Sequence, residues 1–248
     1  MLSADWRVET FDSIDSTNTW LADRARAGES EGLVARTDFQ TAGRGRLGRV
    51  WEAPPGSSLL FSVLLRPALA DGQRQIAVAA VALAVRAAIG EATGQTPDVK
   101  WPNDLLFGPD KVAGILAEAV VTEAGVAIVV GVGVNCSTVD PELRNATTLL
   151  AATGSAPSPA FLLDLILAAL SQRRPLLEHP AGCATLLAEY EQALVTLGQQ
   201  VQITTPTALL RGRACGLGAA GELIVDVAGE LQRFSVGDVI HVRPGEYA

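Results

Sequence analysis

Alternating and continuous apolar positions divide the first half of the chain into strands separated by turns. The segment 6–11 alternates as a strand does, and 15–28 has the capping residues and terminal glycine of a helix. Further strands are predicted over 32–40, 57–66, 105–107, 111–121 and 126–134. We expect the last two to pair as a hairpin across residues 122–125.

Three longer apolar segments predict further helices. The alanine-rich segment 71–91 has apolar residues almost all round, which indicates a helix buried against a sheet. Two more helices are predicted over 161–171 and 184–197, and hairpins interrupt the order of helices and strands. This order favours an α+β fold with a mixed sheet over a strictly parallel α/β fold.

The pattern of apolar residues and turns changes after Gly198. Five short β-type segments separated by glycine turns are typical of a small barrel. They lie at 201–204, 209–214, 223–227, 231–234 and 239–242. We therefore predict two domains, 1–197 and 198–248. We expect the second to pack against the first, because a domain of about fifty residues is only marginally stable alone.

Composition narrows the class of protein. The chain has 248 residues, 48% of them hydrophobic, so it can bury a sizeable core, and its net charge of −8 argues against nucleic acid as a partner. Its three cysteines fit neither a disulfide framework nor a zinc pattern. The longest apolar run, 76–85, is too short to span a bilayer. We expect a cytoplasmic protein that contacts no membrane, with both histidines in ordinary surface or interface positions.

A glycine loop at 43–49 carries three arginines, Arg44, Arg46 and Arg49, in this acidic chain. Its glycines match the dinucleotide fingerprint, but that motif requires a helix directly after the loop. Here the paired prolines at 54–55 forbid one, so the loop lies between two strands. The pattern predicts a mobile phosphate-binding loop that a ligand orders, and a plain surface turn is the alternative.

The remaining polar residues at strand ends suit phosphate chemistry. No serine or cysteine has an adjacent base, and neither a Walker loop nor a zinc motif is present. Arginine binds phosphate with two hydrogen bonds, lysine neutralises a transferring phosphoryl group, and aspartate holds Mg²⁺. Asparagine and glutamine recognise amide-like edges of a ligand. Together these groups are what an adenylating enzyme needs.

Five motifs, in order and at matching spacing, resemble the biotin protein ligases, which are biotin–[acetyl-CoA-carboxylase] ligases. The motifs lie at 13–19 (SIDSTNT), 40–49 (QTAGRGRLGR), 100–105 (KWPNDL), 111–116 (KVAGIL) and 131–135 (GVGVN). The resemblance is dense over 13–135 and weak over the barrel. It implies a mixed-sheet ligase domain with helices packed on it and a small SH3-like β-barrel.

The resemblance also implies a two-step reaction with ATP and Mg²⁺. Biotin is activated as biotinyl-5′-AMP, and a lysine of a biotin carboxyl carrier domain then takes the biotinyl group. The residues implied to bind biotin are Ser16, Thr17, Gln40, Gly43, Arg44, Gly45, Lys111 and Gly114. Those implied for the nucleotide or adenylate are Arg46, Arg49, Trp51, Asn103, Asp104, Asn135 and Arg243. The implied catalytic residues are Lys111, Arg46 and Asp104, and Asp104 is also the candidate ligand of Mg²⁺.

Each assignment has a structural alternative. Ser16 and Thr17 could cap a helix, the tryptophans at 51 and 101 could be core aromatics, residues 103–104 could simply form a turn, and Lys111 could lie on the surface. Two other functions stay open: a lipoate protein ligase, and a noncatalytic biotin or nucleotide sensor.

Two departures from the wider family bear on function. The first strand of the ligase pattern begins at Trp6, so we expect no N-terminal DNA-binding domain and no repressor activity. Leu47 stands inside the loop where some members carry another arginine. Whether the protein is a monomer or a homodimer stays open.

Overall fold

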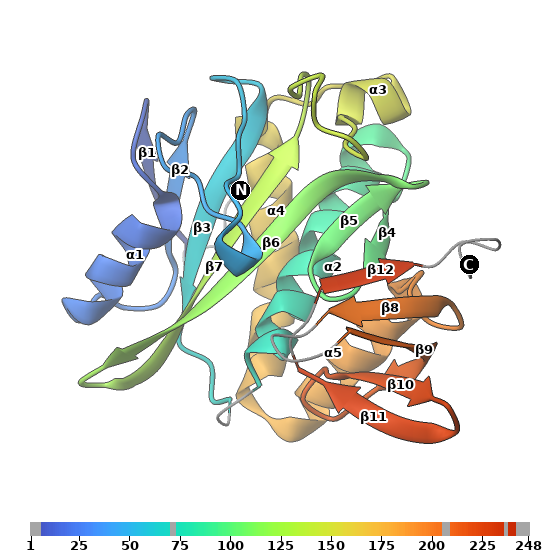
Figure 1. Cartoon of the computed structure of the whole chain (residues 1–248). Coiled ribbons are helices and arrows are strands. Elements are labelled where there is room, and N and C mark those ends of the chain that lie inside the picture. The colour runs from blue at the N-terminus through green and yellow to red at the C-terminus, as the bar shows by residue number, and fades with distance from the viewer. Residues whose placement is uncertain (1–5, 70–72, 205–208, 236–237, 242–248) are drawn as a thin grey trace.

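A seven-stranded mixed sheet forms the centre of the protein in a computed structural model (Figure 1). The structure describes residues 6–69, 73–204, 209–235 and 238–241. The strands, in their order across the sheet, are β1 (Arg7–Phe11), β2 (Leu33–Thr37), β3 (Ser58–Leu65), β7 (Gly125–Asn135), β6 (Asp110–Thr122), β5 (Asp104–Phe107) and β4 (Asp98–Lys100). β1 and β2 pair in parallel, and the other neighbours pair antiparallel.

Helices cover both faces of this sheet (Figure 1). The α-helices are α1 (Thr17–Arg26), α2 (Arg74–Thr93), α3 (Leu149–Thr153), α4 (Pro159–Arg173) and α5 (Pro180–Ala193), and the 3₁₀ turns are η1 (Arg46–Gly48) and η2 (Arg174–Glu178). By length and composition α2 would suit a membrane span, but 67% of its apolar window is buried inside the protein. It packs against α4, α5 and the strands, as a core helix does.

The alternation of side chains along β7 separates the two faces of the sheet. Val130, Val132 and Val134 belong to the large core that contains α2 and α4. Gly131 and Gly133 point to the opposite face because successive residues of a strand face opposite sides. On that face α1 packs over the outer strands, and the two glycines leave room beside it for the side chains of Asn18 and Trp51.

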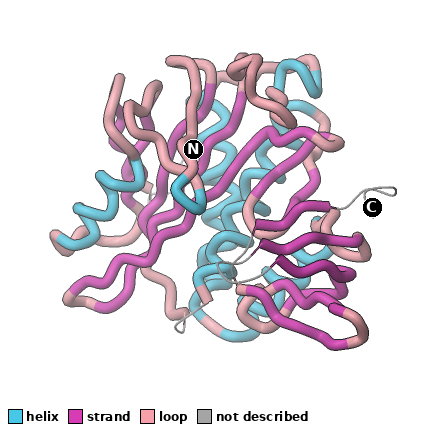
Figure 2. Tube along the Cα trace, viewed as in Figure 1, coloured by secondary structure: helices cyan, strands magenta, loops and turns pink. Residues whose placement is uncertain are grey.

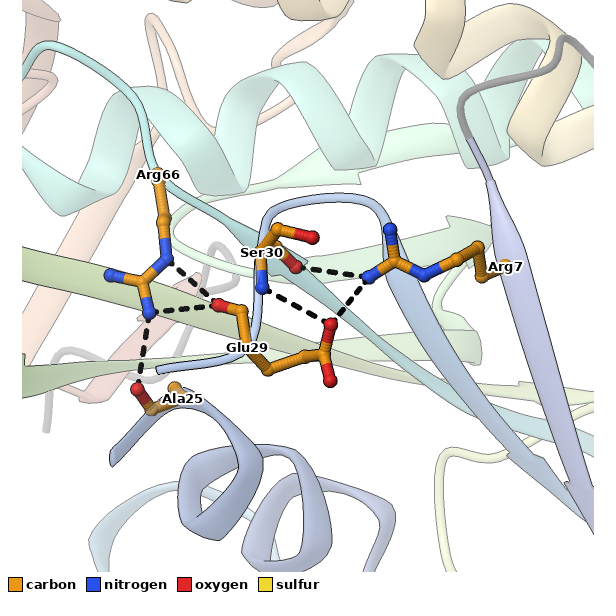
Figure 3. Close-up of polar contacts among 5 residues, drawn as sticks. All are labelled: Arg7, Ala25, Glu29, Ser30 and Arg66. Carbon is orange, nitrogen blue, oxygen red and sulfur yellow. Dashed lines mark hydrogen bonds and ion pairs between the residues drawn. The ribbon is translucent and has the colours of Figure 1, made fainter. Parts of the chain in front are cut away.

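Two arginines hold the connection between α1 and β2 (Figure 3). Arg66 donates to the carbonyl oxygens of Ala25 and Glu29 at 2.9–3.1 Å, which satisfies carbonyls at the end of α1. Arg7 donates to Glu29 Oε1 at 2.8 Å and to the Ser30 carbonyl at 3.3 Å. These bonds hold the end of α1 and the connection that follows it.

A second, five-stranded antiparallel sheet follows α5 (Figure 2). Its strands are β8 (Gln200–Thr204), β9 (Leu209–Leu217), β10 (Leu223–Val227), β11 (Glu230–Phe234) and β12 (Asp238–His241), in the order β11-β10-β9-β8-β12. Val201, Ile203 and Val225 belong to the same buried cluster as α2 and the large sheet. The small sheet is therefore packed directly on the rest of the protein.

The predicted α+β fold with a mixed sheet and a small C-terminal β unit is confirmed. The boundary between 1–197 and 198–248 stays a prediction. The helix predicted over 184–197 was misplaced, because it begins at Pro180 and ends at Ala193. Proline is tolerated in the first turn of a helix, and His179 Nδ1 caps this one by accepting from Gly182 N at 2.9 Å.

Two short elements escaped prediction. β4 (Asp98–Lys100) has three residues and α3 (Leu149–Thr153) has five, too few to show a period of their own. The strand predicted over 32–40 ends at Thr37, where Thr37 Oγ1 donates to the Phe39 carbonyl and the chain turns. The helix predicted from 71 begins at Arg74, after Gln73 at the N-cap, and the predicted positions 71–72 lie outside the described residues.

Candidate functional site

The first turn of α1 is tied to the neighbouring strands by buried hydroxyls. Gln40 Oε1 accepts hydrogen bonds from Thr17 N at 2.9 Å and from Thr17 Oγ1 at 3.1 Å. Ser62 Oγ lies 2.7 Å from Thr17 Oγ1. Ser16 occupies the N-cap position, but its side chain makes no capping hydrogen bond. The predicted capping alternative therefore does not account for the Ser16 hydroxyl.

The indole of Trp51 packs against Gly114 on β6 and Gly133 on β7. A Cβ added at Gly133 would overlap this ring, and one added at Gly114 would lie 2.8 Å from both the ring and Lys111 Nζ. Lys111 Nζ is 5.3 Å from the ring centroid, within the range of a cation–π contact. Trp51 Nε1 is buried and has no hydrogen-bond partner among the described residues. A donor of this kind is available to a ligand.

The arginine loop folds back on itself in front of β7 and β6 (Figure 1). Gly45 N donates to the Arg49 carbonyl at 2.7 Å, and Leu47 takes a left-handed conformation with φ of 56°. Leu47 and Val50 are each 66% exposed. The loop thus presents apolar side chains outward, and it directs Arg44 toward β6 and Arg46 toward the turn before β5.

Charged pairs connect the loop to the sheet and the motifs to one another. Arg46 Nη1 donates to Asn103 Oδ1 at 3.1 Å, and Arg44 forms an ion pair with Glu118 on β6. Lys111 Nζ pairs with Asp104 Oδ1 at 2.6 Å. Since both side chains of this last pair are about one-third exposed or less, its charges are only partly screened by solvent.

The turn before Asp104 is anchored from three directions. Trp101 is 1% exposed and its Nε1 donates to the Gly221 carbonyl at 3.1 Å, so the core alternative for Trp101 holds. The Pro102 carbonyl accepts from Gln75 Nε2 at 2.6 Å and from Tyr190 Oη at 2.9 Å. Burial raises the pKa of Tyr190 well above its usual value, which keeps this phenol protonated.

These elements surround one inner pocket between α1, the arginine loop and the glycines of β6 and β7. Its polar lining residues are Ser16, Thr17, Asn18, Gln40, Arg44, Arg46, Asn103 and Lys111. Three further hollows border it. One lies behind the loop beside Lys100 and Asp104, one beside Asn135 and Arg144, and one is a wide groove along the outside of the loop.

The structure brings most of the predicted site residues together. The inner pocket is lined by Ser16, Thr17, Gln40, Arg44, Gly45, Arg46, Trp51, Asn103, Lys111 and Gly114. Lys111 and Trp51 also line the hollow that contains Asp104 and the hollow that contains Asn135. Arg49 lies on the Asp104 hollow and the outer groove, and Gly43 lines only the outer groove. Arg243 falls outside the described residues.

Asp104 is the candidate ligand for a divalent cation. Among the described residues no group of three or more His, Cys, Asp or Glu side chains is arranged to hold a metal. A dedicated metal cage is therefore not found in that part of the chain. A single carboxylate beside arginine and lysine does fit Mg²⁺ that arrives with phosphates, because Mg²⁺ keeps its waters and needs only one or two carboxylates.

Comparison with known proteins now identifies the family. A sequence profile described as "Biotin/lipoate A/B protein ligase family" matches residues 10–135, and one described as "Biotin protein ligase C terminal domain" matches residues 196–242. The chain belongs to the biotin/lipoate A/B protein ligase family. The resemblance drawn from the five motifs is confirmed.

Individual members of the family are similar to this chain over most of its length. The biotin–[acetyl-CoA-carboxylase] ligase of Mycobacterium tuberculosis is 32% identical over 246 residues, covering 96% of this chain and 90% of that protein. The bifunctional ligase/repressor BirA of Bacillus subtilis is 29% identical, covering 92% of this chain and 72% of that protein. The biotin protein ligase of Aquifex aeolicus in complex with biotin and ATP superposes with a TM-score of 0.82 at 27% identity, covering 96% and 99%.

Three residues of the inner pocket and one residue beside it, Glu118 on the outer groove, were not assigned from the sequence. Asn18, Gly131 and Gly133 lie inside the motifs that carry the resemblance, so their place in the site could have been inferred from the motif alone. Glu118 had a different signal. It is the one charged residue in the otherwise apolar run 112–121 of β6, and a carboxylate there needs partners because burial penalises an unpaired charge.

Proposed function

We propose that this chain is a biotin protein ligase that activates biotin with ATP and transfers it to a lysine of a biotin carboxyl carrier domain. The observation that carries the proposal is the convergence of Thr17, Gln40, Arg46 and Lys111 on one pocket next to a glycine-lined platform. The likeness to the Aquifex aeolicus protein with biotin and ATP supports both substrates.

The first step joins two anions, so it needs positive charge more than acid–base chemistry. A carboxylate oxygen of biotin attacks the α-phosphorus of ATP and forms the new P–O bond. The bond from that phosphorus to the bridging oxygen breaks, and pyrophosphate leaves with the electron pair. Lys111 and Arg46 lie where they can offset the repulsion and stabilise the charge that develops in the transition state.

We assign Trp51, Asn103, Asp104, Arg49 and Asn135 to the nucleotide side. They line the hollows that share Lys111 and the tryptophan ring with the inner pocket. Mg²⁺ bound to ATP would neutralise phosphate charge, and Asp104 would supply one oxygen ligand after leaving its pair with Lys111. Lys111 would exchange Asp104 for phosphate oxygens of ATP, which leaves Asp104 free to bind the cation.

The second step is aminolysis of a mixed anhydride. The neutral amine of the acceptor lysine attacks the acyl carbon of biotinyl-5′-AMP, the C–O bond to AMP breaks, and the amine loses a proton to solvent or to a nearby base. Water competes with the amine for the same carbon. A loop that stays closed over the anhydride favours transfer over hydrolysis.

We further propose the carrier domain of acetyl-CoA carboxylase, or of a related carboxylase, as the acceptor. The named activity of the Mycobacterium tuberculosis and Paracoccus denitrificans relatives supports this choice. The geometry of the pocket does not by itself select a carboxylase, because the acceptor contributes only a lysine side chain to it.

A transfer assay tests the function directly. The protein is incubated with ATP, Mg²⁺ and a biotin carboxyl carrier domain, with biotin in one reaction and lipoate in a parallel one, and pyrophosphate is measured throughout. We expect covalent biotin on the carrier lysine and stoichiometric pyrophosphate. Lipoate transfer without biotin transfer would assign the lipoate ligase activity instead. Binding of biotin without pyrophosphate release would assign a noncatalytic sensor.

A further inference from the structure

Glu118 connects the arginine loop to α1 through both of its carboxylate oxygens. Oε1 forms the ion pair with Arg44 Nη2, and Oε2 accepts a hydrogen bond from Asn18 Nδ2 at 2.7 Å. Asn18 is 4% exposed, and its Oδ1 accepts from Ser62 Oγ on β3 at 2.6 Å. A continuous chain of polar contacts thus runs from the buried face of the sheet to the loop.

The strands are shaped to accommodate this chain of contacts. Gly131 on β7 lies directly beneath the Asn18 side chain, where an added Cβ would overlap Asn18 Oδ1. Asn18 Nδ2 also lies 3.3 Å from the Leu116 carbonyl oxygen on β6, to which it donates. Asn18 is therefore held rigidly, and it presents one amide N–H to Glu118 from a fixed direction.

The pair of Glu118 and Arg44 lies at the boundary between two hollows. Arg44 lines both the inner pocket and the outer groove, Asn18 lines the inner pocket, and Glu118 lines the outer groove. Solvent and an acceptor lysine would arrive through the outer groove, whereas biotin is assigned to the inner pocket. The ion pair therefore forms part of the wall that separates the activated acyl group from the outside.

We propose that Glu118 is a positioning residue that acts through Arg44 to hold the arginine loop against β6 over the inner pocket. Its role is to retain biotinyl-5′-AMP and keep water and stray amines away from it, and it contacts neither substrate. The retention part of this proposal rests on the proposed function. The contact between the loop and the strand does not, so the two can be tested apart.

The first experiment needs no ligand. The loop contains arginines at 46 and 49, so the rate of trypsin cleavage after these two residues reports how often the loop leaves β6. Glu118→Gln keeps an acceptor for Asn18 but removes the charge that pairs with Arg44. We expect cleavage about three- to fivefold faster, the range that a partly exposed ion pair supports. Glu123→Gln, at the exposed turn of the same hairpin, should cleave at the wild-type rate.

A substitution of the loop partner, Arg44, tests the same ion pair independently. Arg44→Gln should accelerate cleavage after Arg49 to the same extent, and Glu118→Gln added to it should have no further effect, because both changes remove one interaction. The single variant Arg44→Gln tests the contact even where Glu118→Gln folds poorly, since Arg44 is partly exposed on the surface. Wild-type cleavage rates in both single variants, or fully additive effects, would overturn the proposal.

The second experiment measures retention in the protein with biotin and ATP but without acceptor. Glu118→Gln should form biotinyl-5′-AMP at the wild-type rate, seen as an unchanged pyrophosphate burst, and release it into solution about three- to fivefold faster. A slower burst with unchanged release would show a catalytic role and overturn the positioning role. Absence of any burst in the wild type would reject the proposed function, while the trypsin result would still decide whether Glu118 holds the loop.

Discussion

At the scale of the single residue, Lys111 lies where the hollows of the site meet. Its ammonium group lies beside the Trp51 ring and 2.6 Å from Asp104, and it lines three of the four hollows around the loop. The sequence allowed a surface lysine at a strand start as an alternative. The convergence of the hollows on this side chain favours the role in phosphoryl transfer.

Lys111→Ala should abolish most of the adenylation. It removes the cation closest to the proposed reacting phosphate, and losing one preorganised charge of this kind costs roughly 100- to 1,000-fold in rate. Pyrophosphate release with biotin and ATP measures the effect. Arg26→Ala, which removes an exposed cation on α1, is the matched control and should keep full activity. Near wild-type release from Lys111→Ala would dismiss Lys111 from the reaction.

Glu31 gives a second residue-scale prediction, about pH. Burial raises the pKa of Glu31 above its ordinary value of 4.5, and the nearby Arg174 only partly opposes this. A raised folded-state pKa of an acid means that stability is fully present below 4.5 and is lost as pH rises through the raised pKa. Glu31→Gln removes this dependence.

The unfolding free energies of the wild type and Glu31→Gln, measured by urea denaturation at several pH values, test this. Their difference should shift in favour of the variant as pH rises above 4.5. Glu142→Gln, an exposed substitution, should run parallel to the wild type throughout. A shift in the opposite direction would show that the pair with Arg174 outweighs burial.

At the scale of the element, alternate residues of β7 face the core on one side of the sheet and the site on the other. Ile128, Val130, Val132 and Val134 belong to the core that contains α2, whereas Val129 packs in the cluster under α1. On the face of Val129, Gly131 and Gly133 form a platform for Asn18 and Trp51. Strand periodicity alone separates the two sets. The side chains that lie on this platform, however, belong to residues more than 75 positions earlier in the chain.

Gly133→Ala should therefore displace the indole of Trp51 without breaking the strand. Forced overlap in a packed site costs about 1–3 kcal/mol of stability. The KM for ATP should rise, since the same ring lines the proposed nucleotide hollow. Thermal unfolding and pyrophosphate kinetics measure the two effects. Gly216→Ala is the control, because its added Cβ would meet only a flexible Glu191 oxygen at 3.3 Å. Equal effects from the two substitutions would contradict the role of the platform.

At the scale of the whole molecule, the distribution of cations is unusual for an enzyme proposed to acylate lysine. The chain has 19 lysines and arginines, and the lysines are only Lys100 and Lys111, both lining the hollow behind the arginine loop. Arginine stays protonated in proteins and is a poor nucleophile, whereas a neutral lysine amine attacks an acyl-adenylate. Surface charge built from arginine is consistent with little self-modification.

Arg49→Lys tests this on the loop itself. Without an acceptor, and with biotin and ATP present, we expect covalent biotin on position 49 of the variant and little on the wild-type protein. Mass spectrometry of tryptic peptides locates the label. Arg7→Lys, on the edge strand β1, carries the same change at a distance from the pocket and should be labelled far less. Equal labelling at 7 and 49 would show that escaped adenylate, and not the loop, is the source.

The large sheet and the small sheet also share one core, and this arrangement positions the turn before Asp104. Gln75 of α2, Tyr190 of α5 and the Gly221 carbonyl, in the turn between β9 and β10, all contact residues 101–102. These contacts join parts of the chain that are far apart in sequence. No local pattern could have predicted them, because hydrogen bonds between distant segments depend on how the helices pack.

The sequence by itself determined the longer strands, the buried helix α2, the position of the arginine loop and the motifs of the site. Those features depend on local spacing: alternation in strands, apolar residues round a helix, and glycines and prolines at turns. Only the tertiary structure decided that Arg44 would pair with Glu118, that Trp51 would lie on Gly133, and that Lys111 would border three hollows. The physical reason is that these contacts form between faces of different elements, and which faces meet is set by the packing of the entire core.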